Sequence, residues 1–114
     1  MSDAVAGASR GGQTWIRTDL NGFITQISAE GALMLGVAQK FAAGRRLPTF
    51  FNGDRPGVYR DMRAAYDSRS PITRQHILKP LEHRAISVEF WLQYVAETRE
   101  LLWMFIRTET GLVL

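Results

Sequence analysis

The sequence contains no cysteine among its 114 residues. Without cysteine there can be no disulfide framework, no thiolate zinc site and no cysteine nucleophile. Long hydrophobic runs are also missing, because the longest apolar run, Leu101–Ile106, has only six residues. A transmembrane helix needs roughly 20 apolar residues, so we expect neither a membrane span nor a signal peptide. These absences are typical of a cytoplasmic protein.

Histidine is scarce, and basic residues are not clustered. Metal sites usually bring three or four ligands together, whereas His76 and His83 are the only two histidines. His76 lies in the middle of a predicted strand and His83 in a turn, so we expect both at the surface and predict no metal site. The net charge is +3, but Arg45-Arg46 is the only adjacent basic pair. Nucleic-acid binding normally uses a clustered basic patch, so we predict no nucleic-acid partner.

The composition that remains is that of one globular domain. Hydrophobic residues make up 46% of the chain and charged residues 22%, which is ordinary for a globular protein. We expect residues 1–13, which end in Gly11-Gly12 and a glutamine, to form a flexible lead-in. Residues 14–110 would form the domain and residues 111–114 a C-terminal tail.

Hydrophobic periodicity and turn residues predict strands at both ends of the domain and helices between them. Asn21-Gly22 indicates a hairpin, Ser28 and Asp54 are suitable N-caps, and Gly36 would end the first helix. The order strand-strand, helices, strand-strand-strand favours an α+β fold with an antiparallel sheet. The expected strands are 14–19, 23–27, 72–79, 84–95 and 99–109, and the main expected helices are 29–35 and 55–67.

The three tryptophans lie in three different predicted strands. Side chains two residues apart share a face of a strand, and each tryptophan falls on the parity that also carries charged or polar residues. In the last strand this parity contains Trp103, Phe105 and Arg107. We therefore expect Trp15, Trp91 and Trp103 on the sheet face opposite the aliphatic core, where large rings need a cover.

Four short motifs, taken together, resemble those of the PAS domain family over roughly residues 14–110. Residues 15–24, Trp-Ile-Arg-Thr-Asp-Leu-Asn-Gly-Phe-Ile, look like the family's opening hairpin "TD-x-(D/N)-G-x-I". Residues 28–36, Ser-Ala-Glu-Gly-Ala-Leu-Met-Leu-Gly, resemble its "N-x-A-x-x-x-L-G" helix. Residues 44–47, Gly-Arg-Arg-Leu, look like the "G-(R/K)-x-L" turn, and Asp54-Arg55 like the "D-R" before the long helix.

The resemblance implies a five-stranded antiparallel sheet in the order second, first, fifth, fourth, third, with helices on one face. In this order the three tryptophan-bearing strands are neighbours, so their rings would form one outer patch. PAS domains commonly dimerise through this face, and we predict a homodimer. Residues 1–13 or a neighbouring domain could cover the patch instead, or it could stay exposed. The predicted interface residues are Trp15, Trp91, Trp103 and Phe105.

PAS ligands lie between the helices and the inner sheet face, so the resemblance also implies a candidate pocket. The alternative is a filled core, because aliphatic residues at core spacing are core until a cavity is shown. Met62 and Tyr66 of the long helix should point towards the inner face. The candidate lining is Ile16, Ile24, Leu33, Phe51, Met62, Tyr66, Phe90, Leu92, Met104 and Ile106.

The family's best-known cofactors do not suit this sequence. Haem-binding PAS domains carry a ligating histidine on the long helix, and helix 55–67 has none. Flavin photoreceptor members, and those that bind the coumaroyl chromophore, need a cysteine for attachment. We therefore predict neither a cysteine-linked flavin nor a helix-ligated haem. No catalytic motif is present, and we predict no enzyme activity.

The function that the resemblance implies is a non-catalytic sensory or interaction module in signal transduction. The family's usual "R-D-I-T" exit to an output helix reads Arg107-Thr108-Glu109-Thr110 here, and the missing aspartate argues against the usual relay to a kinase or cyclase in the same chain. Either an output domain lies outside this sequence, or the protein acts through a partner. A ligand-free assembly domain is one alternative. A small enzyme of the ketosteroid-isomerase type is another, and it would need a buried carboxylate beside Tyr66 or Tyr94.

Overall fold

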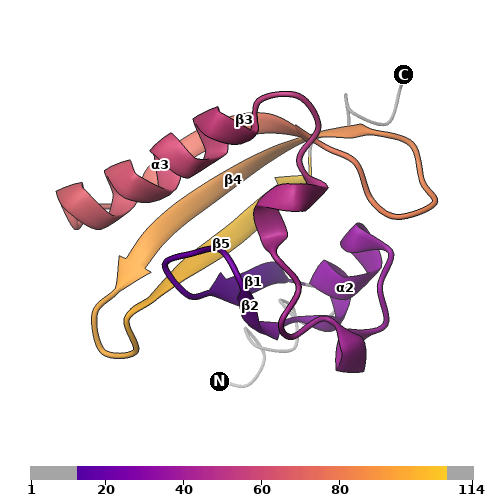
Figure 1. Cartoon of the computed structure of the whole chain (residues 1–114), viewed down its shortest axis with the longest axis horizontal. Helices are drawn as coiled ribbons and strands as arrows, with labels where there is room; N and C mark the ends of the chain where they lie inside the picture. Colours follow the sequence, from indigo (N-terminus) through magenta and orange to yellow (C-terminus); the bar gives the residue numbers. More distant parts are fainter. Residues whose placement is uncertain (1–12, 108–114) are drawn as a thin grey trace, which may run out of the picture.

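Five strands form one antiparallel sheet in the computed structural model, which describes residues 13–107 (Figure 1). The sheet order is β2-β1-β5-β4-β3, so the predicted α+β fold and strand order are confirmed. The predicted lead-in up to residue 12, and the predicted exit segment and tail from residue 108, lie outside the described residues. The strands are β1 (Thr14–Thr18), β2 (Ile24–Ile27), β3 (Ile72–Leu78), β4 (Ile86–Val95) and β5 (Glu100–Arg107).

Two α-helices and two 3-10 turns connect β2 to β3. The predicted caps are confirmed, because Ser28 Oγ accepts a hydrogen bond from the Gly31 N–H and Asp54 Oδ1 accepts one from the Gly57 N–H, both at 3.0 Å. No helix within residues 13–107 is long and apolar enough to cross a membrane. The elements are α2 (Ala29–Leu35), η1 (Gln39–Phe41), η2 (Leu47–Phe50) and α3 (Arg55–Ser68).

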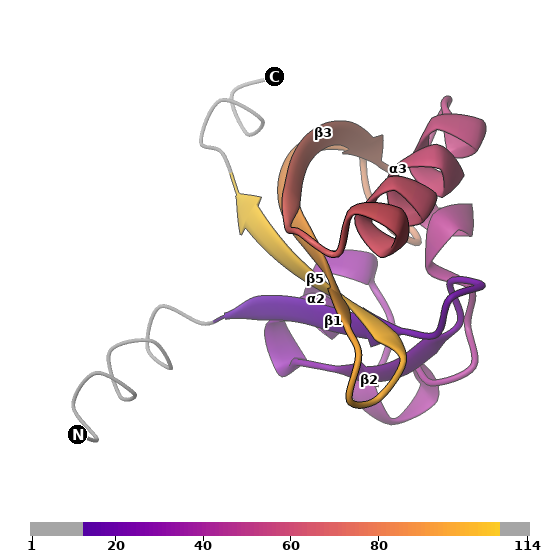
Figure 2. The same cartoon turned by 90° about the vertical axis from the view of Figure 1, so that its left-hand side faces the viewer.

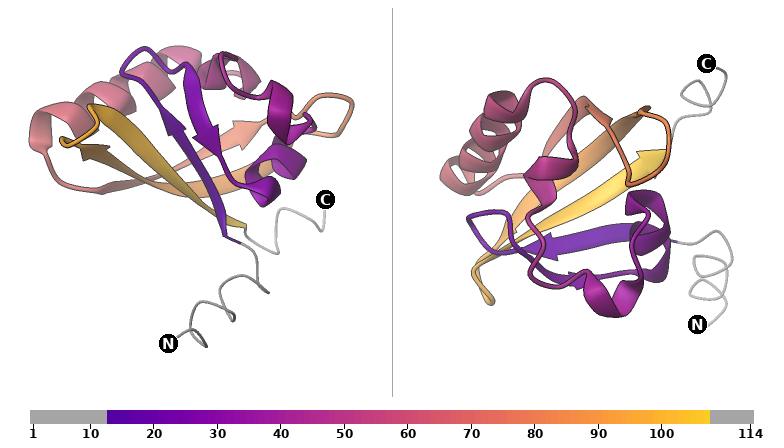
Figure 3. Two further views of the ribbon diagram at one scale, coloured as in Figure 1. Left: turned by 90° about the horizontal axis from the view of Figure 1, so that it is seen from below. Right: turned by 45° about the vertical axis from the view of Figure 1, so that its right-hand side comes forward.

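The β1–β2 turn is held in place by its own aspartate and by η2. Asp19 Oδ1 accepts hydrogen bonds from the N–H groups of Asn21 and Phe23, both at 2.9 Å. Gly22 has a φ of 92°, and a Cβ at this position would come within 2.7 Å of the Pro48 ring. Only glycine satisfies both conditions, so the turn and η2 can lie side by side (Figure 3).

Helix α3 lies along β3 and β4 on the inner face of the sheet (Figures 1 and 2). The predicted apolar stripe is confirmed, because Val58, Met62 and Ala65 are buried. Tyr66 is partly buried and packs edge-on against Tyr94 of β4, with 4.9 Å between ring centroids. Met62 and Tyr66 therefore point towards the sheet, as predicted.

Trp103 is at the centre of the core rather than on the outer face. Its side chain is 0% exposed, and its Nε1–H donates a hydrogen bond to Thr18 Oγ1 at 3.0 Å. Its ring centroid lies 5.1 Å from that of Phe90, 6.1 Å from that of Phe51 and 6.3 Å from that of Phe105. These aromatic contacts fill the space between the sheet and η2.

The predicted facing of the last strand is therefore wrong. Trp103 and Phe105, predicted on the outer face, are 0% and 7% exposed in the core. Met104 and Ile106, predicted to line an interior pocket, fall on the outer parity of β5, and Ile106 is 49% exposed. Residues 101–106 are apolar on both parities, so hydrophobic alternation could not decide which face each parity takes.

The turn between β4 and β5 determines this facing. Val95 pairs with Glu100, which places Trp103 opposite Leu92. If Val95 paired with Arg99 instead, Leu102 would lie opposite Leu92. A shift of one residue moves every side chain of a strand to the other face, so the observed register places Trp103 and Phe105 in the core and Met104 and Ile106 on the outer face.

The prediction that Leu33 lines an interior pocket is also wrong. It is 76% exposed on α2, whereas Gly31, Ala32, Met34 and Leu35 of the same helix are buried. A Cβ at Gly31 would lie 2.9 Å from the Trp15 carbonyl oxygen, so the glycine side of α2 is the one pressed against β1. Leu33, two residues further on, points away from that contact.

Candidate functional site

The outer face of the sheet carries a row of three large apolar side chains. Met104 of β5 lies directly opposite Trp15 of β1 on one side and Trp91 of β4 on the other. All three are partly exposed to solvent, whereas their neighbours Ile16, Trp103 and Phe90, on the opposite parity of the same strands, are buried in the core. We call Trp15, Met104 and Trp91 the outer-face row. The structure thus places Met104, and not Trp103, between the two outer tryptophans.

A polar cluster lies beside this row on the same face. Glu100 accepts hydrogen bonds from Thr25 Oγ1 at 2.5 Å and from Arg17 Nη1 at 3.4 Å. The hydrogen bond from the Thr25 hydroxyl is the main reason that the pKa of the Glu100 carboxyl lies below its ordinary value. Partial burial raises this pKa, whereas the Thr98 hydroxyl and the Arg17 guanidinium lower it further. The cluster joins β2, β1 and β5 through charged hydrogen bonds.

The interior residues predicted to line a pocket are packed as core. The six of them that are fully buried have exposures of 4% or less. Aromatic rings occupy the middle of this region, with Phe51 and Phe90 5.8 Å apart. These contacts support the filled-core alternative at this position. The six are Ile16, Ile24, Phe51, Met62, Phe90 and Leu92.

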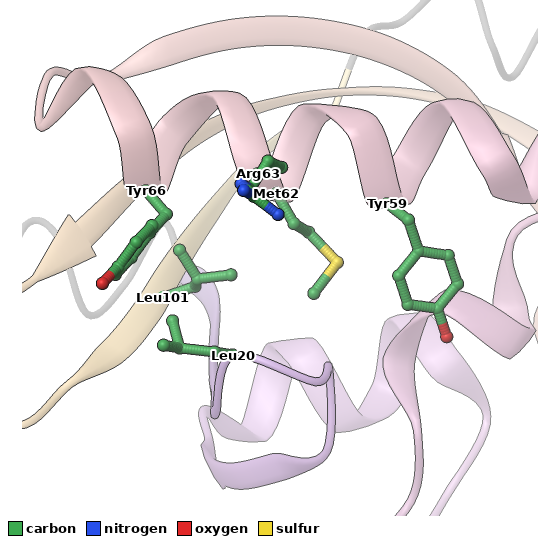
Figure 4. Close-up of a pocket in the computed structure, with 6 residues that line it drawn as sticks. All are labelled: Leu20, Tyr59, Met62, Arg63, Tyr66 and Leu101. Atoms are coloured by element: carbon green, nitrogen blue, oxygen red, sulfur yellow. The ribbon is translucent and has the colours of Figure 1, made fainter.

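A pocket of about 370 Å³ lies to the side of this core, between α3 and the β1–β2 turn. Figure 4 shows Tyr59, Met62 and Tyr66 extending from the side of α3 on which Leu20 and Leu101 lie. Only Met62 and Tyr66 were among the predicted lining residues. We call this pocket the α3 groove, and its lining residues are Leu20, Tyr59, Met62, Arg63, Tyr66 and Leu101.

The end of the α3 groove at Tyr66 is fixed by two further contacts. Tyr66 packs edge-on against Tyr94, and the Arg69 guanidinium lies 4.7 Å and 4.6 Å from the centroids of the two rings. Arg69 is also the C-cap of α3 and has a φ of 58°. Cation–π contacts of this kind orient aromatic rings, so Tyr66 is held as a fixed wall.

Asp61 connects the middle of α3 to β3. Its carboxylate contacts His76 Nε2 at 2.8 Å through one oxygen and accepts a hydrogen bond from Arg74 Nε at 3.0 Å through the other. The His76 ring stacks on Phe90 with 5.7 Å between centroids. The prediction of a surface histidine is wrong for His76, whose side chain is only 13% exposed. It is correct for His83, which is exposed.

Within the part of the chain that the structure describes, the acidic side chains do not line the α3 groove. Within residues 13–107, no three histidine, aspartate or glutamate side chains lie close enough together to hold a metal ion. The lining of the α3 groove has two tyrosines but no carboxylate. Asp61 is occupied by its two basic partners. A carboxylate beside a tyrosine in an apolar pocket, which a ketosteroid-isomerase-type enzyme requires, is therefore not found in the α3 groove.

The polar cluster and the α3 groove differ in how much of each could have been predicted from the sequence. The polar cluster joins residues 75 and 83 positions apart in the chain, for which the sequence holds no signal. The helical spacing of Tyr59, Met62, Arg63 and Tyr66, in contrast, is visible in the sequence. The two remaining lining residues, Leu20 and Leu101, come from a turn and a strand that only the fold brings to this helix.

Comparisons with known proteins identify the fold. No protein-family model and no curated protein matches the sequence. Solved structures do match. The PAS domain of a protein from Colwellia psychrerythraea has a TM-score of 0.78 at 16% identity, covering 95% of this chain and 97% of that chain. The PAS domain of the HTR-like protein from Haloarcula marismortui has a TM-score of 0.73 at 14% identity, covering 94% and 97%.

A third similar structure was solved with a ligand. It is the RpfR quorum-sensing receptor PAS domain from Cronobacter turicensis in complex with BDSF, with a TM-score of 0.71 at 13% identity, covering 83% of this chain and 92% of that chain. At such identities the likeness concerns the fold alone. From the sheet order and these likenesses, we conclude that the chain has the fold of a PAS domain.

Proposed function

We propose that this chain is a non-catalytic sensory or interaction module of the PAS type that associates with a second copy of itself through the outer-face row. The sensory part of the proposal is supported by the neighbours with this fold. They include a quorum-sensing receptor domain and a domain of a sensor histidine kinase/response regulator from Geobacter sulfurreducens. A signal would act by binding one arrangement of such a module better than another.

The observation that carries the association is the outer-face row itself. Two tryptophans and a methionine are aligned across three neighbouring strands and remain partly exposed. A whole aromatic side chain buries about 150–250 Å², and association would bury the part of each ring that is still exposed. Together with the exposed Ile106, the row could form the apolar centre of an interface, which in a standard case buries roughly 800 Å² per partner.

Polar residues border the row, as expected for an interface. The Arg17–Glu100 ion pair lies on the same face, and Glu89 sits opposite Ile106. Interfaces typically combine an apolar centre rich in tryptophan and methionine with a polar rim. A two-fold dimer would use this one surface twice.

A charge placed in the row tests the proposal. We expect the wild-type chain to sediment as a dimer at tens of micromolar and Met104→Arg to sediment as a monomer with an unchanged circular dichroism spectrum. Ala43→Arg is the matched control, because it introduces the same side chain at an exposed position outside the sheet, and it should remain dimeric. A monomeric wild-type chain, or a dimeric Met104→Arg variant, would contradict the proposal.

The packed interior favours association over a ligand held inside the core. Phe51, Phe90 and Trp103 occupy the region between the sheet and η2, so we do not propose an interior ligand. This filling is also the observation that favours the ligand-free assembly domain as a second candidate. In that case association would persist without any small molecule.

A further inference from the structure

We propose that the α3 groove binds a small amphipathic carboxylic acid, with its apolar body between α3 and the β1–β2 turn and its carboxylate on Arg63. The volume of about 370 Å³ lies within the roughly 300–1,000 Å³ of small-molecule sites. The groove opens at the side of the domain, so a ligand could enter it without displacing the aromatic core. The proposal rests on the proposed sensory function in one respect: the bound acid would act as the signal of that module. Binding itself does not require association.

The apolar part of the groove is built from three elements. Leu101 of β5 and Met62 of α3, with exposures of 0% and 4%, form the floor. Leu20 and Tyr59 form opposite rims and are 41% and 39% exposed. These rims leave apolar surface in contact with water across a concave space. An apolar ligand body would cover that surface.

The space exists because of where α3 lies. The helix packs on β3, β4 and η2, and Tyr66 is held towards β4 by Tyr94 and Arg69. The β1–β2 turn is fixed by Asp19 and by the contact of Gly22 with η2, and at Gly22 it lies close to the end of the Met62 side chain of α3. Both walls are thus held by contacts outside the groove, so the groove is formed before a ligand binds.

The charges around the groove favour an anion. Arg63 lines it, and Arg69 lies against the ring of Tyr66. Asp67 is the present partner of Arg63 at 3.1 Å, but the two side chains are 58% and 77% exposed. Exposed helical pairs of this kind are weak, so the guanidinium can exchange Asp67 for a ligand carboxylate, which it can bind with two parallel hydrogen bonds.

A carboxylate facing the groove would repel a bound anion, but the carboxylate of the β1–β2 turn is engaged elsewhere. Asp19 is turned to the N–H groups of its own turn. The groove therefore combines an apolar floor, two tyrosine walls and a guanidinium at the helix side. This combination suits an aromatic or short aliphatic monocarboxylate better than a neutral or cationic molecule.

A titration followed by amide NMR tests the proposal, with 4-phenylbutyrate as the acid and 4-phenylbutanamide as its neutral counterpart. We expect saturable shifts at Leu20, Leu101 and residues 59–66, with tighter binding of the acid. Arg63→Gln should weaken binding of the acid about tenfold and leave that of the amide unchanged. Arg60→Gln is the matched control, because Arg60 is exposed on the same helix but does not line the groove.

Four results would overturn the proposal, and three of them concern the binding itself. They are no saturable shift up to about 10 mM acid, equal binding of acid and amide, and equal effects of Arg63→Gln and Arg60→Gln. Shifts centred on Phe90 and Trp103 would also overturn it, because they would indicate an interior site. Repeating the titration on the Met104→Arg variant should give the same affinity, which separates failure of the groove from failure of the association interface.

Discussion

At the scale of single residues, Trp103 shows how one contact can make a large aromatic ring a core residue. Its indole N–H would lack a partner in an aliphatic core, and burying it unpaired would be costly. Thr18, itself 0% exposed, accepts that hydrogen bond from the neighbouring strand. The buried hydroxyl and the buried indole therefore satisfy one another, and Trp103 can fill the centre of the molecule.

This predicts unequal costs for the same substitution on the two faces of the sheet. Trp103→Phe removes the hydrogen bond and leaves a void, so it should lower the free energy of unfolding by about 2 kcal/mol. Trp91→Phe, on the partly exposed face, should cost less than about 1 kcal/mol in a Met104→Arg background, where association does not contribute. Urea unfolding followed by circular dichroism measures both. Equal costs would contradict the assignment of Trp103 to the core.

Glu100 predicts a pH dependence of stability. Its pKa is lower in the folded chain than its ordinary value of 4.5, chiefly because of the Thr25 hydroxyl. The stabilisation is therefore complete above the unfolded-state pKa and is lost as the pH falls through the lower folded-state pKa. Wild type and Glu100→Gln should differ in free energy of unfolding at pH 7 and converge towards pH 3. Glu97→Gln, in the exposed turn before β5, should show no such convergence.

At the scale of elements, the β4–β5 turn determines which residues of β5 enter the core. The turn closes with a hydrogen bond from the Arg99 N–H to the Ala96 carbonyl at 3.3 Å, and Arg99 has a φ of 58°. Left-handed backbone of this kind is strained for arginine and easy for glycine. Because Arg99 belongs to the turn, β5 begins at Glu100, which pairs with Val95. This register places Trp103 on the inner face of the sheet.

Two arginines with the same φ of 58° should respond differently to glycine. Arg99→Gly relieves the backbone strain and should raise the free energy of unfolding by about 0.5–1 kcal/mol. Arg69→Gly relieves the same strain but also removes the guanidinium from Tyr66 and Tyr94, so its gain should be smaller or reversed. Urea unfolding of the two variants side by side tests this. A larger gain for Arg69→Gly would contradict the role given to its side chain.

At the scale of the whole molecule, the two faces of the sheet differ in what covers them. The inner face, with α3 and η2, holds the aromatic core, while the outer-face row is left to solvent or to a partner. Association linked to folding makes stability depend on protein concentration. The two functions proposed above therefore use surfaces on opposite sides of the sheet and can be tested separately.

The thermal midpoint should report this association. For the wild-type chain we expect the midpoint to rise by several degrees between about 2 and 200 µM, because mass action favours the associated folded state. The midpoint of Met104→Arg should not change over the same range. Differential scanning fluorimetry at several concentrations measures both. A constant wild-type midpoint would argue against the proposed dimer.

Much of the fold could be predicted because its signals are local. The caps at Ser28 and Asp54, the Asn21-Gly22 turn and the stripe of α3 each depend on a few adjacent residues. The strand order also followed, through the resemblance of the motifs to PAS domains. The site was predicted less well, since the α3 groove and the polar cluster join residues from elements far apart in the chain.

The order of the elements could be predicted from local signals in the sequence. The inner face of β4 and the outward facing of Trp15 and Trp91 could also be predicted, because polar and apolar residues alternate in β1 and β4. The facing of β5 and the burial of His76, in contrast, depend on contacts between elements far apart in the chain. Residues 101–106 are apolar on both parities, so their facing depends on the register set by one turn. His76 is polar in a mixed strand, and only α3 brings it the carboxylate of Asp61 that allows its burial.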